Sequence, residues 1–186
     1  MDYETVKRTV GGSVDVTMER LIGPELAPRA VEIFLPYFDS IMFEDLIALP
    51  GAMEILESLQ ANDKRLAVFT NKRGDAARAT LKHLGMTPFL EKIIGANDTP
   101  WRKPQLEFTR HALDAMNGTP EQSCLVGDSP FDVESATVVG MPCHVVATGT
   151  HDQEQLGETE AKSVHANLSE LARECFDLDI SPNFDT

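Results

Sequence analysis

Short apolar runs alternate with helix-forming segments over residues 51–175, and this order constrains the fold more than any other feature of the chain. The apolar runs are typical of buried strands: RLAVFTN, EKIIGAND, SCLVGDS and PCHVVATG. The segments between them carry apolar residues at helical spacing, and Gly85 and Gly118 are placed to end two of them as C-terminal caps. The alternation predicts an α/β fold, a parallel sheet with helices on both faces.

Residues 1–48 lack this alternation and are expected to be helical. VDVTMERLIG and AVEIFLPYFDSIMF carry apolar residues three and four positions apart, and no segment there has the period of a strand. The pattern changes near Leu49-Pro50-Gly51. We therefore expect a helical part at 1–48, an α/β core at 49–175 and an acidic C-terminal tail at 176–186.

The charge balance narrows the range of partners. The chain has 186 residues, with 16 Lys and Arg against 30 Asp and Glu, a formal net charge of −14. This acidity argues against nucleic acid and against an anionic membrane surface as partners. It does not exclude an anionic small molecule, because a few local cations or a metal can override the global charge.

Cysteine usage and hydropathy favour a cytoplasmic protein. Its oligomeric state stays open between a monomer and a homodimer. Cys124, Cys143 and Cys175 form no CxxC pair and no zinc spacing, which fits a reducing compartment. No apolar run approaches the ~20 residues of a membrane span. The N-terminal residues contain no stretch like that of a signal peptide.

Ligands bind such sheets at the carboxyl ends of the strands, so the polar residues after each apolar run are candidate site residues. Thr70 and Asn71 follow the first run, where a hydroxyl and backbone N–H groups near a helix start can cradle a phosphate oxygen. Lys103 stands before Pro104 after the second run, where its ammonium can neutralise a phosphate. Each candidate has an alternative interpretation. Thr70 and Asn71 can form a simple turn and helix cap, and Lys103 can be a solvated loop lysine.

Asp128 and Asp132 follow the third run and lie one helical turn apart. Two carboxylates at this spacing suit Mg²⁺, which prefers hard oxygen ligands. The alternative, in which Asp128 or Ser129 caps the next helix, is compatible with that role. A hydroxyl, a cation and a carboxylate pair at successive strand ends favour one shared site over three separate helix caps.

Three segments resemble motifs of the haloacid dehalogenase (HAD) superfamily, in its phosphoglycolate phosphatase-like branch: VFTNK, RKP and LVGDSPFDVESATVVGM. In addition, GGSVDVTMERLIG resembles part of the helical cap of that branch, and LPGAMEILESL resembles the return from cap to core. The resemblance implies a Rossmann-like core with a small helical cap, Mg²⁺ as cofactor, and hydrolysis of phosphomonoesters through an aspartyl-phosphate.

The resemblance also implies roles for individual residues. Thr70 and Asn71 would bind the transferring phosphoryl group, and Lys103 would stabilise its charge. Asp128 would bind Mg²⁺, and Asp132 would bind or support the metal. Thr70, Lys103 and Asp128 are therefore the catalytic candidates.

The family's nucleophile, the first Asp of a DxDGT-type motif before the cap, has no counterpart that we find in this chain. Without that carboxylate there is no covalent phospho-enzyme route, and without the second Asp there is no general acid for the leaving alcohol. We expect a shortened family member with an incomplete cap: a truncated gene product, a misplaced start or a non-catalytic descendant. Because the family's first strand is central, we also expect a gap in the sheet, whose neighbouring strands close up or lose backbone partners.

The DxD of the chain is Asp177-Leu178-Asp179, and a circular permutation would be needed to place it centrally. The acidic-tail interpretation is favoured, because LAREC before it is helix-like and no Gly-Thr follows it.

Two functions stay open. The first is a phosphatase acting on a small phosphorylated metabolite such as 2-phosphoglycolate. The second is a non-catalytic binding or regulatory protein that keeps the Mg²⁺ and phosphate sites. A receiver-like signalling domain is disfavoured, because a receiver places its acids before its Thr and Lys.

Overall fold

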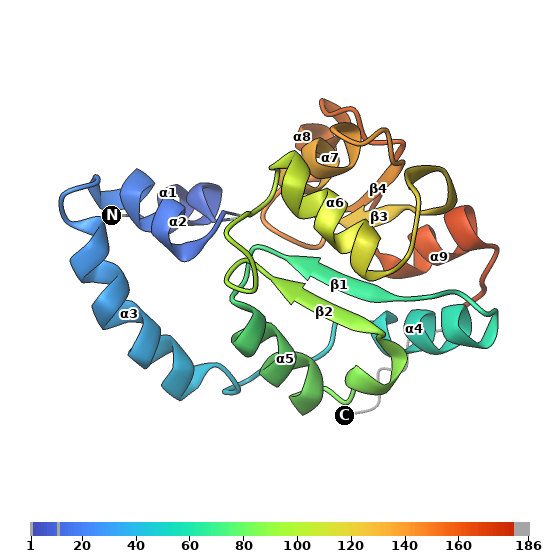
Figure 1. Ribbon diagram of the computed structural model, residues 1–186, viewed down its shortest axis with the longest axis horizontal. Coiled ribbons are helices and arrows are strands. Elements are labelled where there is room, and N and C mark those ends of the chain that lie inside the picture. Colours follow the sequence, from blue (N-terminus) through green and yellow to red (C-terminus); the bar gives the residue numbers. More distant parts are fainter. Residues whose placement is uncertain (1, 11, 181–186) are drawn as a thin grey trace.

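Helices and parallel strands alternate along the structure, a computed structural model that describes residues 2–10 and 12–180 (Figure 1). The helices are α1 (Tyr3–Thr9), α2 (Val14–Ile22), α3 (Ala27–Ile41), α4 (Ala52–Ala61), α5 (Gly74–His83), α6 (Leu106–Ala115), α7 (Pro130–Thr137), α8 (Gln153–Gly157) and α9 (Leu168–Phe176). Short 3₁₀ helices lie at Thr87–Phe89 and Pro120–Gln122. The strands are β1 (Ala67–Thr70), β2 (Lys92–Gly95), β3 (Leu125–Gly127), β4 (Cys143–Val146) and β5 (Ser163–His165). The expected α/β class is confirmed.

The first three helices lie to one side of the α/β part and are drawn in blue in Figure 1. Helices α2 and α3 contact each other, and Ala27 is the buried residue that they contain. The expected helical character of residues 1–48 is confirmed over their described part. No helix in the described ranges has the length and hydropathy needed to cross a membrane.

The strands form two parallel sheets rather than the single sheet that the sequence predicts. Strand β1 pairs with β2, while β4 lies between β3 and β5. Within residues 2–10 and 12–180 no pairing joins β1 to β3, and Val126 of β3 is 40% exposed. The expected gap is therefore present, and the strands beside it keep an edge without a strand partner instead of closing up.

Strand β4 is buried along its whole length and carries the core on both faces. Cys143 and Val145 pack in one cluster with residues of α7 and α8. Val146 packs in a second cluster with Ile55 of α4 and Leu171 of α9. Because successive side chains of a strand point to opposite faces, this one strand separates two helical layers.

Helix α6 links the two sheets by contacting β1 of one sheet and helix α7, which packs on the other. The ring of Phe108, which is fully buried, lies 4.6 Å from that of Phe69 in β1, measured between centroids. The next residue, Thr109, donates a hydrogen bond of 3.0 Å from its hydroxyl to the carbonyl of Ser135 in α7. Helix α7 in turn packs on β3 and β4.

The sequence does not predict α8 or β5. Strand β5 has three residues, of which Val164 is the apolar one, so no continuous apolar run marks it. After α6, the residue with positive φ is Asn117 at 47° rather than the expected cap Gly118. The amide of Gly118 nonetheless donates to the carbonyl of Leu113 at 2.9 Å, so the helix end is still closed.

The first residues of the expected tail are part of the packed core. Phe176 and Leu178 pack against the cluster of α4 and α9, and Ile180 is buried within it. The rest of that tail, residues 181–186, lies outside the described residues.

Candidate functional site

A cavity of about 510 Å³ lies between β1 and β3, where the gap in the sheet falls. Val68 and Phe69 of β1 and Val126 of β3 contribute apolar atoms to its lining. The residues that the sequence assigns to the site all line it as well: Thr70, Asn71, Lys103, Asp128 and Asp132. The structure therefore brings the candidates from three separate segments to the carboxyl ends of two strands, as the topology predicts.

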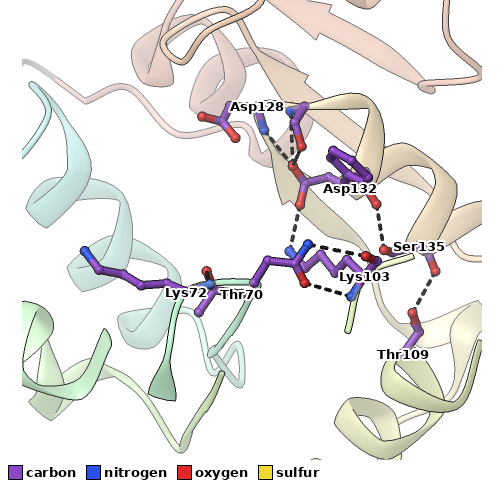
Figure 2. Close-up of polar contacts among 10 residues, drawn as sticks. Thr70, Lys72, Lys103, Thr109, Asp128, Asp132 and Ser135 are labelled. Atoms are coloured by element: carbon purple, nitrogen blue, oxygen red, sulfur yellow. Dashed lines mark hydrogen bonds and ion pairs between the residues drawn. The ribbon is translucent and has the colours of Figure 1, made fainter. Parts of the chain in front are cut away.

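Thr70 is the last residue of β1 and lines the cavity together with Lys72 and Lys103, all three of which are labelled in Figure 2. Its Oγ1 accepts a hydrogen bond of 3.1 Å from the backbone N–H of Lys72. The expected local turn is thus present. It leaves the hydroxyl hydrogen of Thr70 available to a bound oxygen, because a hydroxyl can accept and donate at once.

Asn71 holds the backbone of Lys103. Its Oδ1 accepts from the Lys103 N–H at 2.8 Å, and its Nδ2 donates to the Lys103 carbonyl at 3.3 Å. These bonds join the end of β1 to the segment before α6. Asn71 is therefore a positioning residue for Lys103, and a direct bond from its amide to phosphate stays a prediction.

Lys103 and Asp132 form a buried ion pair beside the cavity (Figure 2). The distance from Nζ to Oδ1 is 2.7 Å, and each side chain is 8% exposed. The ammonium also lies 4.5 Å from the ring centroid of Phe69, a cation–π contact. The alternative of a solvated loop lysine is wrong.

The second oxygen of Asp132 organises the start of α7. Oδ2 accepts from the hydroxyl of Ser129 at 2.7 Å and from the N–H groups of Asp128 and Ser129 at 3.1 Å, which completes a capping box. Burial tends to raise the pKa of Asp132, but the Lys103 charge and these hydrogen bonds outweigh it and lower the pKa. Since both oxygens are engaged, the contacts favour a supporting role, and a direct bond to metal stays a prediction.

Asp128 follows β3 and is exposed at the cavity. Desolvation and the negative charge of Asp132 raise the pKa of the Asp128 carboxyl, against the opposing effect of Lys103 and His151. Gly149 passes so close to this carboxylate that a side chain at position 149 would collide with it. A bound cation would offset the repulsion between the two acids, so among the described residues that line this cavity Asp128 is the best suited to hold Mg²⁺.

Helix α3 covers one side of the cavity and contributes Phe38 to its lining. The ammonium of Lys72 lies 5.3 Å from the Phe38 ring centroid, and burial lowers the pKa of Lys72. Arg73 forms an ion pair of 2.6 Å with Asp39 of the same helix. Lys72 and Arg73 are thus further cations of the lining, beside Lys103. The contact of Lys72 with α3 is not indicated by any spacing in the sequence.

The permuted alternative is wrong. Asp177 ends α9 with a φ of 55°, and the residues after it pack against α4 instead of pairing as a strand. Neither Asp177 nor Asp179 lines the cavity. Among the described residues that do, the carboxylates are Asp128 and Asp132.

The parallel α/β core, the helical part beside it and a polar site at the strand ends are the arrangement that the HAD resemblance implies. The chain belongs to the haloacid dehalogenase-like hydrolase family, whose model matches residues 1–146. It is 29% identical over 182 residues to a phosphoglycolate phosphatase of Rhodospirillum rubrum, covering 92% of this chain and 75% of that protein. A phosphoglycolate phosphatase of Caulobacter vibrioides is 26% identical over 185 residues, covering 96% and 78% of the two chains.

Solved structures have the same fold. The crystal structure of a protein described as a predicted phosphatase from Clostridium acetobutylicum matches with a TM-score of 0.83 at 22% identity, covering 95% of this chain and 83% of that one. By sequence homology the chain is of the HAD phosphatase type.

Proposed function

We propose that the cavity binds the phosphoryl group of a small phosphomonoester together with Mg²⁺, in the manner of a phosphatase for a metabolite such as 2-phosphoglycolate. One observation carries this proposal: a hydroxyl, an ammonium and a carboxylate, on Thr70, Lys103 and Asp128, line the same cavity. The named activity of the two bacterial relatives supports the substrate class.

Each of these groups has a task that its surroundings support. The hydroxyl of Thr70 and the N–H groups after β1 would donate to the phosphoryl oxygens. Lys103 would neutralise their charge, since an ammonium has three donors and the contact with Asp132 uses one of them. Val68 and Val126 contribute apolar atoms to the wall beside these groups.

The donor set fits Mg²⁺ at Asp128. That carboxylate is exposed at the cavity, and the raised pKa of Asp128 reflects a negative charge that a cation would stabilise. Asp132 would fix the backbone beneath it through the N–H groups of Asp128 and Ser129. When bound, Mg²⁺ would supply a positive charge next to the phosphoryl oxygens.

Hydrolysis also needs a nucleophile, and here a second candidate function is favoured by a specific observation. Within the described lining the carboxylates are Asp128 and Asp132, and the first is assigned to metal while the second is bonded through both oxygens. A site with these groups alone would bind phosphate and Mg²⁺ but would have no carboxylate available to form an aspartyl-phosphate. The second candidate is therefore a non-catalytic phosphate-binding or regulatory protein.

One experiment separates the two candidates. Phosphate release from an aryl phosphate is measured with the whole chain and MgCl₂, in parallel with calorimetric binding of orthophosphate. Turnover that is lost in Asp128→Asn, but kept in the matched surface variant Asp114→Asn of α6, supports the phosphatase. Mg²⁺-dependent orthophosphate binding without turnover supports the second candidate. Neither binding nor turnover contradicts both.

A further inference from the structure

A second cluster of chemically reactive side chains lies on the face of the β3–β4–β5 sheet that α9 covers. The parallel register pairs His144 of β4 with Ser163 of β5, and His165 is two positions further along β5. Because side chains alternate between faces, these three point to the same side. Cys175 of α9 reaches the same point from above the sheet.

The polar atoms of this cluster converge closely. The Sγ of Cys175 lies 3.2 Å from Nδ1 of His144 and 3.3 Å from Nε2 of His165. The hydroxyl oxygen of Ser163 lies 2.7 Å and 2.6 Å from the same two nitrogens. His144 and His165 are both buried, at 9% and 2% exposure.

Protons alone do not satisfy these contacts. An imidazole nitrogen either donates or accepts, and Ser163 and Cys175 have one hydrogen each. Each of the two nitrogens is close to both Ser163 Oγ and Cys175 Sγ, which makes four contacts. If both nitrogens accept, only the hydroxyl and thiol hydrogens are available for these four contacts. If both nitrogens donate, only their two N–H hydrogens are available. In the mixed case one imidazole N–H donates to Ser163, the Ser163 hydroxyl donates to the other nitrogen, and the thiol can donate to Ser163 at 3.6 Å. The two Sγ–N contacts of 3.2 and 3.3 Å then have no hydrogen between their atoms. A cation held by the two nitrogen lone pairs and a thiolate removes this conflict.

The dimensions suit a small cation with nitrogen and sulfur ligands. With Zn–N near 2.0–2.1 Å and Zn–S near 2.3 Å, tetrahedral geometry separates sulfur from nitrogen by about 3.5 Å. The observed separations of 3.2 and 3.3 Å differ from that by a few tenths of an ångström. The hydroxyl of Ser163 is closer to both nitrogens than a fourth ligand would be, so it would rotate aside or be replaced in that position by water.

The surroundings of His165 also favour a ligand role. Its other nitrogen, Nδ1, is buried and has no hydrogen bond within the described structure, and the carboxylate of Glu174 lies 3.4 Å from it. A carboxylate on that side favours the tautomer with the proton on Nδ1, which leaves the Nε2 lone pair facing Cys175. Ligand histidines in metal sites commonly have such a partner.

We propose that His144, His165 and Cys175 bind Zn²⁺, at a site distinct from the phosphate-binding cavity. None of the three lines that cavity, and imidazole and thiolate ligands select Zn²⁺ over Mg²⁺. The cation would join β4 and β5 to α9, so its role is to fasten the last helix to the sheet.

Cobalt titration of the metal-free whole chain tests the site, with excess MgCl₂ present to occupy Asp128. We expect one equivalent of Co²⁺ to produce a sulfur-to-metal charge-transfer band that Zn²⁺ displaces. The band is lost in Cys175→Ser and kept in Cys124→Ser, whose thiol lies outside the cluster. Glu174→Gln, which changes the half-exposed partner of His165, should weaken Co²⁺ binding about 10-fold or more. No band in the wild type, or a band that persists in Cys175→Ser, overturns the site.

A second measurement needs no variant and covers the case in which Cys175→Ser does not fold. Zn²⁺ should slow alkylation of Cys175 by iodoacetamide in the native wild type at least about tenfold, read by peptide mass spectrometry, while Cys124 serves as the internal control. Equal alkylation of Cys175 with and without Zn²⁺ contradicts the proposal.

Discussion

Replacing Lys103 by Met tests the energetic centre of the candidate site. The substitution keeps an unbranched apolar chain against the ring of Phe69 but leaves the Asp132 carboxylate, 8% exposed, without its cation. Removing one partner of a buried pair costs about 3–5 kcal/mol. Because Oδ2 of Asp132 keeps three hydrogen bonds, we expect the free energy of unfolding to fall by an amount near the lower end of that range, about 3 kcal/mol. For a chain of this size that corresponds to a fall in Tm of about 6–12 °C.

The assay is urea unfolding followed by circular dichroism, with Lys64→Met on the exposed surface as the matched control. If Lys103→Met lowers the free energy of unfolding no more than Lys64→Met does, the Lys103–Asp132 pair is not structurally important. A double-mutant cycle with Asp132→Asn measures the coupling directly. Coupling below about 0.5 kcal/mol would be the value expected of independent sites and would contradict the buried pair.

The same pair predicts a pH dependence. The folded pKa of Asp132 is lowered, so its ionised form contributes stability that is present above its ordinary pKa near 4 and is lost as pH falls through the folded value. In Lys103→Met the opposing effect of burial remains, so the pKa of Asp132 rises. The stability difference between wild type and variant should therefore be full near pH 7 and shrink below about pH 4. A difference that stays constant down to pH 3 would argue against this linkage.

Two further substitutions test the surroundings of the site. Gly149→Ala should displace the Asp128 carboxylate and weaken Mg²⁺ binding measured by calorimetry. The control Gly157→Ala, whose added methyl group meets open space, should leave Mg²⁺ binding unchanged. Equal Mg²⁺ affinity in both variants would count against Asp128 as the metal ligand. Phe108→Ala should cost about 3–5 kcal/mol in urea unfolding, because the ring is fully buried against Phe69. A cost under about 1 kcal/mol would show that α6 does not hold the two sheets together.

The sequence predicts the candidate site well where the topology alone decides the outcome. Thr70 and Asp128 line the same cavity because they follow the carboxyl ends of β1 and β3, and the alternation of apolar runs is enough to predict these positions. Lys103 joins them, although its burial could not be inferred, because the ion pair with Asp132 spans 29 positions and no local pattern encodes it. The same holds for Asn71, whose side chain bonds a backbone 32 positions away.

The elements that the sequence does not predict are short. Strand β5 is three residues long and polar at both ends, so it has neither an apolar run nor a measurable period. That strand supplies His165, and the cluster around Cys175 therefore becomes visible only when the register of β4 and β5 is known. The gap between β1 and β3, by contrast, follows from the expected central strand and agrees with the observed topology.

Calorimetric titration of orthophosphate, with and without MgCl₂, tests the central claim most directly. The wild type should bind phosphate in a Mg²⁺-dependent manner, and Thr70→Val and Asp128→Asn should each weaken that binding at least about tenfold, the loss expected for one charge-assisted hydrogen bond or one metal ligand. Equal phosphate affinity in all three proteins, or binding that ignores Mg²⁺, would contradict the assignment of this cavity.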